Sequence, residues 1–418
     1  MRIRPVARLG RVALAAVVVA GALVVPLATN ASADTPPPAP VDTVGADALP
    51  TWQINGVVWS QAIVGNTVYV TGSFTKARPP GVAVGGAGEV PAQNIFAYDI
   101  RTGAPVAGFS HALNGQGLVI RGSVDGSRVY VGGDFTEVDG VARGHLAAFD
   151  TATGALLNWA PNIGGQVRGL AVTPSMVYVG GNYPSANGVL RTHLAAFQVS
   201  NAAITDWAPA VAGTGGYVWA MVMTPDQSQV VVGGSFATLN GMAAYGMGAL
   251  DATTGATRPW AAQERIRTAG LNGGITSLKA DDTTIYGSGY AFGSGATFEG
   301  TFGADPDGGA IRFVNDCLGD TYDVSPLSGA LYSVGHVHNC TVIGGFPDTS
   351  PRSRWQKAMA NSLTPAGITA VKDAYGWDFR GLPYTELVQW YPDLEFGTYT
   401  PDRQAAWAVE GSGDYVVL

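Results

Sequence analysis

Short apolar stretches alternate with Gly-containing turns along most of this chain. One marker recurs, an apolar, mostly β-branched pair followed in nearly every copy by small residues. It reads VYVTGSF at Val68, VYVGGDF at Val129, VYVGGNY at Val177, VVVGGSF at Val230, IYGSGYA at Ile285, LYSVGHV at Leu331 and YVVL at Tyr415. Each copy follows an apolar stretch and a turn, and most continue into a Gly-containing loop and a second apolar stretch. Four short strands in a unit of about 50 residues predict the blades of a β-propeller.

The predicted fold is therefore all-β, a propeller of about seven four-stranded blades whose last blade is incomplete. The 58 Gly and 25 Pro suit tight turns better than helix interiors. A parallel β-helix is the structural alternative, although its rungs are usually shorter than this period. The last copy stops at Leu418 inside an apolar strand. Either the first strands of the chain complete this blade or the sequence is a fragment of a longer protein, and we favour the fragment because an open strand edge invites unwanted pairing.

The copies also share the element AFDTATGALLNW, in which Asp150 and Gly154 can form a turn and Trp159 can fold over the next blade. Trp207 and Trp260 keep the same offset within their copies. A repeated indole at a blade junction is explained by the apolar area that it buries. His145 and His193 occupy matching places before the LAAF stretch, and we interpret them as structural side chains, with a metal pair as the alternative.

The amino terminus has the features of a secretory signal peptide. Four Arg precede an apolar run, residues 12–28, which is followed by the cleavage signal Ala31-Ser32-Ala33. An uncleaved membrane anchor is the alternative. We therefore expect a signal peptide at 1–33, a Pro-rich linker at 34–50 and the propeller at 51–418, with further modules after it. The protein is expected to be secreted, extracellular or associated with the cell wall.

Charge narrows the possible partners. Removing the four Arg of the leader leaves 19 basic and 31 acidic residues, a net charge of −12. Such a balance argues against nucleic acid and anionic membranes as partners. In an exported chain the two cysteines, Cys317 and Cys340, are expected to form a disulfide, with metal ligation by free thiolates as the alternative.

The repeat VYVGGDF…NG…LAAFD..TG….W.P resembles the repeats of secreted actinobacterial β-propeller proteins, which are related to delta-60 and quinoprotein-like repeats. The stretches DCLGDTYDV, VGHVHNCTVIGGFP and AAWAVEGSGDYVVL resemble the later blades of that group. The resemblance implies a propeller outside the cell, often followed by a PKD or a concanavalin-like lectin module. It leaves molecular activity poorly defined. The Trp after the Gly is displaced by one residue from the quinoprotein pattern, so a quinone cofactor is not favoured.

Equivalent positions of the innermost strands predict a ring of side chains at one mouth of the channel. Counting back about ten residues from each marker selects Trp59, Arg121, Arg168, Trp219, Thr276, Tyr322 and Trp407. Such a ring suits sugar rings, which stack on aromatic faces, or a carboxylate held by Arg. The alternative is that these side chains pack between blades.

Two further regions contain candidate residues. His336 and His338 alternate on one strand and, with Asp320, form an acceptable set of metal ligands, unless they belong to a structural corner stapled by the disulfide. Residues 351–401 break the period and are interpreted as an aromatic-rich insertion with a short helix at 354–363. In it, Trp377 and Trp390 suggest carbohydrate binding or burial of the loop.

Common catalytic signatures such as H-E-x-x-H and G-x-S-x-G are absent from the sequence. The predicted function is a secreted, non-catalytic binding or scaffolding module for a glycan or a cell-surface protein. No cofactor is expected, although a divalent metal remains open. The alternatives are an extracellular oxidoreductase or carbohydrate-active enzyme with its site at the channel mouth, and a purely structural spacer.

Overall fold

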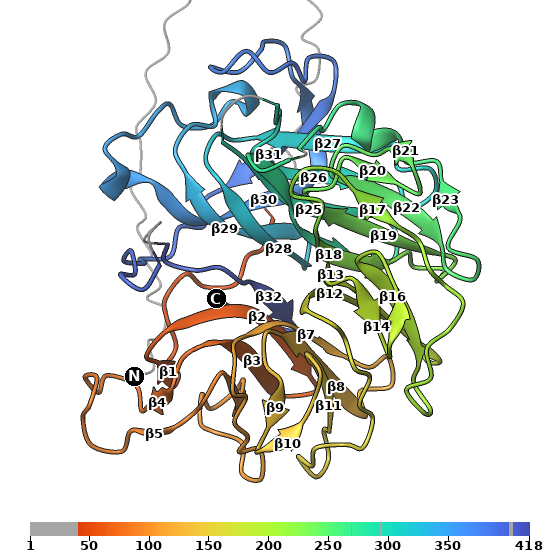
Figure 1. Cartoon of the computed structure of the whole chain (residues 1–418). Helices are drawn as coiled ribbons and strands as arrows, with labels where there is room; N and C mark the ends of the chain where they lie inside the picture. The colour runs from red at the N-terminus through yellow and green to blue at the C-terminus, as the bar shows by residue number, and fades with distance from the viewer. Residues whose placement is uncertain (1–40, 269, 293–294, 401–403) are drawn as a thin grey trace, which may run out of the picture. The chain divides into compact units, whose positions relative to one another are not determined.

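Seven inner strands follow one another around a central axis and close into a ring (Figure 1). The computed structural model describes residues 41–268, 270–292, 295–400 and 404–418, so the expected signal peptide and residues 34–40 of the linker lie outside the described residues. The inner strands are β2 (Val57–Val64), β7 (Gly117–Gly122), β12 (Gln166–Val172), β18 (Val218–Met223), β24 (Gly273–Ala280), β28 (Thr321–Leu327) and β32 (Glu410–Ser412). Each contacts the next, and β32 contacts both β28 and β2, which closes the ring.

Each inner strand begins an antiparallel sheet that extends outward. The second strands are β3 (Thr67–Ser73), β8 (Arg128–Gly133), β13 (Met176–Asn182), β19 (Gln229–Gly234), β25 (Ile285–Ala291), β29 (Ala330–Val337) and β33 (Tyr415–Val417). The third strands are β6 (Ile95–Asp99), β11 (Leu146–Asp150), β16 (Leu194–Gln198), β22 (Met247–Asp251), β26 (Gly300–Ala304) and β30 (Gln356–Ile368). The fourth strands are β23 (Thr257–Arg258), β27 (Ile311–Asp316) and β31 (Pro383–Val388), and a single bridge replaces them in blades one to three. This arrangement is a seven-bladed β-propeller and confirms the predicted fold.

Small hairpins and single turns connect the blades' strands. The short strands are β1 (Gln53–Ile54), β4 (Lys76–Arg78), β5 (Val90–Pro91), β9 (Glu137–Val138), β10 (Val141–Ala142), β14 (Ser185–Ala186), β15 (Val189–Leu190), β17 (Val211–Ala212), β20 (Thr238–Leu239) and β21 (Met242–Ala243). The helical turns are the 3-10 helices η1 (Ala261–Glu264), η2 (Thr341–Ile343) and η3 (Arg352–Arg354). Asn187 and Gly188 both have positive φ between β14 and β15, as a type I′ hairpin requires.

The matching histidines have a backbone role. His145 and His193 have φ of 64° and 70°, and the equivalent Asn94 and Gly246 also have positive φ. Asn, His and Gly tolerate this left-handed conformation better than most residues. His193 Nδ1 also accepts a hydrogen bond from the backbone N–H of Tyr183, at 3.2 Å. The backbone conformation at both positions and the hydrogen bond of His193 support the structural interpretation.

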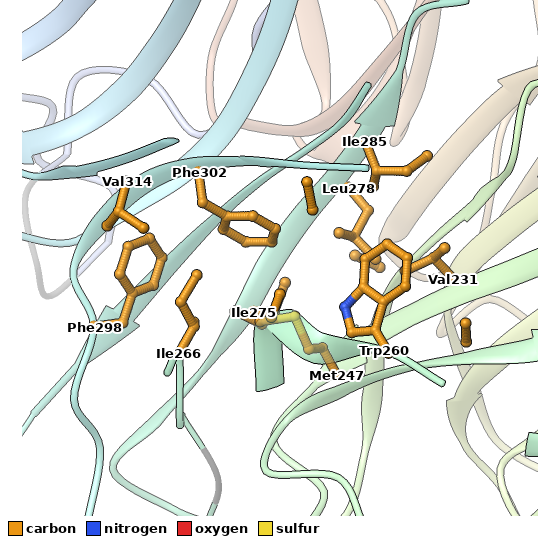
Figure 2. Packing of buried hydrophobic residues seen from close by; sticks show 14 of the residues in the cluster. Val231, Met247, Trp260, Ile266, Ile275, Leu278, Ile285, Phe298, Phe302 and Val314 are labelled. Carbon is orange, nitrogen blue, oxygen red and sulfur yellow. The ribbon is translucent and has the colours of Figure 1, made fainter. Parts of the chain in front are cut away.

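The repeated Trp residues join neighbouring blades, as predicted. Trp159 Nε1 donates to the carbonyl of Gln198, and Trp207 Nε1 donates to the carbonyl of Asp251, each at 2.9 Å across a blade boundary. Figure 2 shows how Trp260 packs into the cluster between blades four and five, near Val231 and Leu278. The core is thus divided into layers between blades.

Blade six corrects two expectations about residues 351–401. Most of the predicted helix at 354–363 belongs to strand β30, which pairs with β29 on one side and β31 on the other. Ala and Met are good helix formers, but such preferences differ by less than ~1 kcal/mol per residue, and pairing of this stretch between two strands overrides them. Because β30 and β31 complete the blade, the segment is in large part the outer half of blade six and not an insertion.

Blade seven has two strands, β32 and β33, as the sequence predicts. Among the described residues, no strand pairs with the outer edge of β33, and residues 41–50 form no strand. Instead, Val41 and Val44 pack against the cluster that contains Tyr332 and Trp390. A groove of about 520 Å³ lies beside β33.

Cys317 and Cys340 form the predicted disulfide, with their Cα atoms 4.3 Å apart. Both residues are buried, and they pack with Val337, Ile343 and Met359 in one cluster. The bond ties the end of β27 to the loop after β29, which joins blade five to blade six.

Replacing both cysteines by Ser is expected to lower the free energy of unfolding by roughly 3 kcal/mol, because the closed loop restricts the unfolded chain. Urea unfolding of the variant beside the native protein measures the difference. Thiol labelling of the native protein before and after unfolding is the control, and reactive thiols in the native protein would contradict the prediction.

Candidate functional site

Six of the seven inner strands carry the same irregularity at the same place. In each, one residue is skipped in the pairing with the second strand, which marks a β-bulge. The skipped residues are Trp59, Leu118, Arg168, Trp219, Thr276 and Tyr322. A bulge turns its extra side chain away from the regular alternation of the strand. The repeat thereby directs one side chain from each of six blades toward the channel.

These six side chains line a cavity of about 200 Å³ together with Gln116 and Trp407. Trp407 lies just before β32 and supplies the seventh blade's contribution. Cavities that hold drug-sized ligands typically measure ~300–1,000 Å³, so this one suits a single ring or the end of a chain.

Aromatic rings dominate one side of the cavity. The rings of Trp59 and Trp407 meet edge to face with centroids 5.0 Å apart, and Tyr322 lies 4.0 Å from Trp407. On the other side, Trp219 stacks on Tyr290 at 5.7 Å. Contacts between rings hold these side chains in place, since such pairs contribute ~0.5–1.5 kcal/mol beyond the area they bury.

A chain of polar groups positions the single cation of the cavity. Arg168 Nε donates to Gln166 Oε1, and the amide of Gln166 donates to Asp134 at 2.7 Å. The amide of Gln116 donates to the second oxygen of Asp134, while Gln116 Oε1 accepts from Trp59 Nε1 at 2.9 Å. Burial lowers the pKa of Arg168 from its usual value, and the charge of Asp134 opposes that effect. Arg168 therefore stays a cation held in a fixed orientation.

The structure brings together all but one of the predicted ring residues. Arg121 is the exception, because it lies among the residues at the carboxyl ends of the inner strands, where it donates to Ser60 Oγ and to the carbonyl of Ile120. Leu118 lines the cavity at the position that the sequence predicted for Arg121. The hairpins of blades two and four are longer, so Leu118 lies twelve residues before Tyr130, just as Trp219 lies twelve before Val231. Applying one offset to both blades would have found Leu118.

The predicted metal set is not assembled. His336 Nε2 lies 3.9 Å from Asp320 Oδ2, but His336 Nδ1 is hydrogen-bonded to the amide of Gln404. The rings of His336 and His338 both pack against Trp355, at 5.1 and 5.0 Å. Across the part of the chain that the structure describes, no group of three or more His, Cys, Asp or Glu is placed to hold a metal ion. Packing against the indole explains these histidines better than coordination does.

Trp377 and Trp390, the two Trp of the 351–401 segment that were predicted as ligand contacts, also lie away from the cavity. Trp390 is 4% exposed and packs edge to face on Tyr332, with centroids 4.9 Å apart, so it is the blade-junction Trp of blade six. Trp377 is partly buried against the cluster between blades four and five, beside Phe379. Their prediction as ligand contacts is corrected, because neither lines the cavity: Trp390 is buried in the core, and Trp377 packs against its edge.

Sequence reasoning missed a group of buried acids in blades five and six. Glu299, Asp316 and Asp373 are each at least nine-tenths buried. Burial raises the pKa of Glu299 to about 8, and the charges of Asp320 and Asp373 add to the rise. Burial likewise raises the pKa of Asp316 to about 8, with contributions from Asp373 and Glu299. The three residues come from separate parts of the chain, and no pattern in their spacing predicts that they lie close together.

Comparison with known proteins adds information about the fold. No known family model matches the chain, and no curated protein matches its sequence. A chain in the crystal structure of the mitotic checkpoint complex is 12% identical, with 87% of each chain covered and a TM-score of 0.52. The likeness shows the fold alone. The WD40 domain of Neurospora crassa Pan2 is also similar, at 10% identity over 55% of this chain and 59% of that domain, with a TM-score of 0.33.

Among the described residues, no helix has the length and apolar character needed to cross a bilayer.

Proposed function

We propose that this chain is an exported, non-catalytic propeller that binds carbohydrate at its channel mouth. The observation that carries the proposal is the ring of side chains directed inward by repeated bulges, in which Trp59, Trp219, Tyr322 and Trp407 present aromatic surface around one small cavity. Sugar rings have apolar faces that pack on such surfaces, while their hydroxyl groups need fixed polar partners. Gln116, Arg168 and Thr276 supply those partners.

The composition of the cavity favours binding over catalysis. None of its eight lining residues is an acid, a histidine, a cysteine or a serine. Hydrolysis of a glycosidic bond usually requires two carboxyl groups on either side of that bond. Arg, Gln and Thr can hold a ligand but do not form such a pair. The enzyme alternative is therefore weaker than a binding module at this site.

The disulfide and the leader support an extracellular location. Disulfides persist in oxidising surroundings and are rare in the cytosol. The described residues include one, between Cys317 and Cys340. The excess of acidic residues further disfavours nucleic acid as a partner.

Trp407→Leu is expected to weaken binding to a responsive oligosaccharide at least tenfold, about 1.4 kcal/mol, because the change keeps an apolar side chain but removes the aromatic face on which a sugar ring packs. The measurement is calorimetric titration with a panel of neutral and uronic-acid oligosaccharides and purified cell-wall polysaccharide. Trp377→Phe, which is partly buried against the cluster between blades four and five, is the matched control and should bind as the native protein does. Saturable binding to no member of the panel, or equal binding by the Trp407 variant, would refute the proposal.

A further inference from the structure

The hydrogen-bond donors of the channel mouth outnumber the acceptors that remain for them. Both oxygens of Asp134 accept from the amides of Gln116 and Gln166, and the side-chain oxygens of the two glutamines accept from Trp59 and Arg168. On the opposite side, Asp320 Oδ2 accepts from the hydroxyl of Tyr322 at 2.9 Å. The acceptors around the ring are therefore largely engaged within the protein.

The guanidinium of Arg168 keeps donors that no described residue engages. Within the described residues, Arg168 forms no ion pair, and its hydrogen bond uses Nε, which leaves the two terminal nitrogens of the guanidinium for other partners. The indole Nε1 atoms of Trp219 and Trp407 also have no acceptor among the described residues, but they have almost no accessible surface, so the donors that a ligand can reach are those of the guanidinium. A ligand that brings acceptors to these nitrogens gains charge-assisted hydrogen bonds.

From this imbalance we infer that the channel mouth selects an acidic carbohydrate, whose carboxylate is held by Arg168 while its ring lies against the aromatic side chains. The inference rests on the proposed function and names its ligand class. A carboxylate is a group that only accepts hydrogen bonds, and its two oxygens match the paired terminal nitrogens of a guanidinium. The small cavity accommodates one uronic-acid unit at the end of a chain.

The position of Asp134 is compatible with this selection. Gln166 is hydrogen-bonded to both Asp134 and Arg168 and lies between them. The negative charge of Asp134 partly balances the positive charge of Arg168, which lowers the cost of keeping this cation in a confined site without a ligand. Its oxygens do not bond the terminal nitrogens, so the direct position beside the guanidinium remains for the ligand's carboxylate.

The test compares an oligogalacturonate with the same oligosaccharide after its carboxyl groups have been reduced to hydroxymethyl groups. The native protein should bind the acidic form at least tenfold more tightly. Arg168→Gln should abolish this preference, so that the variant binds the acidic and the reduced form with about equal affinity. Arg168→Lys keeps the charge but loses the paired geometry, and an intermediate preference is expected.

Arg121→Gln is the matched control, since Arg121 lies at the opposite opening and bonds Ser60 and the carbonyl of Ile120. It should keep the full preference for the acidic form. Urea unfolding of each variant shows whether the fold is intact, and the Lys variant serves if the Gln variant is unstable.

The outcomes separate the two proposals. Equal binding of both oligosaccharides, or a preference that survives Arg168→Gln, would overturn the acidic ligand and leave carbohydrate binding in place. Failure to bind either form or any member of the wider panel would remove both. If a peptide carboxylate bound in an Arg168-dependent way and none of the oligosaccharides bound, carbohydrate would be ruled out as the ligand class.

Discussion

Glu299→Gln is expected to make the protein more stable than the native chain at pH 9 and about equally stable at pH 5. Glu299 is 5% exposed, and burial raises the pKa of its carboxyl from 4.5 to about 8. Between these values the folded protein binds a proton that the unfolded chain has lost. The free energy of unfolding therefore falls as pH rises from about 4.5 to about 8, by on the order of 5 kcal/mol if Glu299 titrates alone.

Glutamine keeps the shape of the protonated acid and can still accept the hydrogen bond that Glu299 Oε2 receives from the backbone N–H of Gly319, at 2.8 Å. Urea titrations at several pH values between 5 and 9 measure the effect. Glu264→Gln, on the surface, is the control and should follow the native curve. A native stability that does not change between pH 5 and 9, or a Gln variant that is weaker at every pH, would contradict the expectation.

Periodicity in the sequence was sufficient to predict the propeller. The apolar pair of each marker becomes the second strand of a blade, and the small residues after it allow close packing between blades: a Cβ on Gly132 would lie 2.3 Å from the side chain of Val167 in the next blade. The last copy of the marker likewise predicted the two strands of blade seven. These features are local, and each copy repeats them.

The site could be predicted only as far as the repeat is regular. Counting from the markers found Trp59, Arg168 and Tyr322 because their hairpins share one length, and it placed Arg121 wrongly because the hairpin of blade two is longer. The β-bulge explains why these positions face the channel, and nothing in the residue types reveals it.

Contacts between distant segments lie beyond the sequence pattern. The residues around Trp390 have the composition of a ligand-binding loop. Trp390 nevertheless packs on Tyr332, as Trp159 packs on Tyr130. Glu299 and Asp373 interact only because the loop after β30 returns to blade five. Tertiary packing decides both cases.

Trp390→Ala is expected to lower the free energy of unfolding by about 4 kcal/mol, because the indole is 4% exposed and its removal leaves a cavity in a packed junction. Trp390 lies in one cluster with Tyr332, Ala406 and Val409. Ala406 directly precedes Trp407 in the chain, and Val409 directly precedes β32. Since β32 links β28 to β2, loosening this cluster should also weaken ligand binding at the mouth. Urea unfolding and oligosaccharide titration of the same variant measure both effects, with Trp390→Phe as the milder control. If Trp390→Ala lost ligand binding but kept the stability of the native protein, Trp390 would be a ligand contact after all.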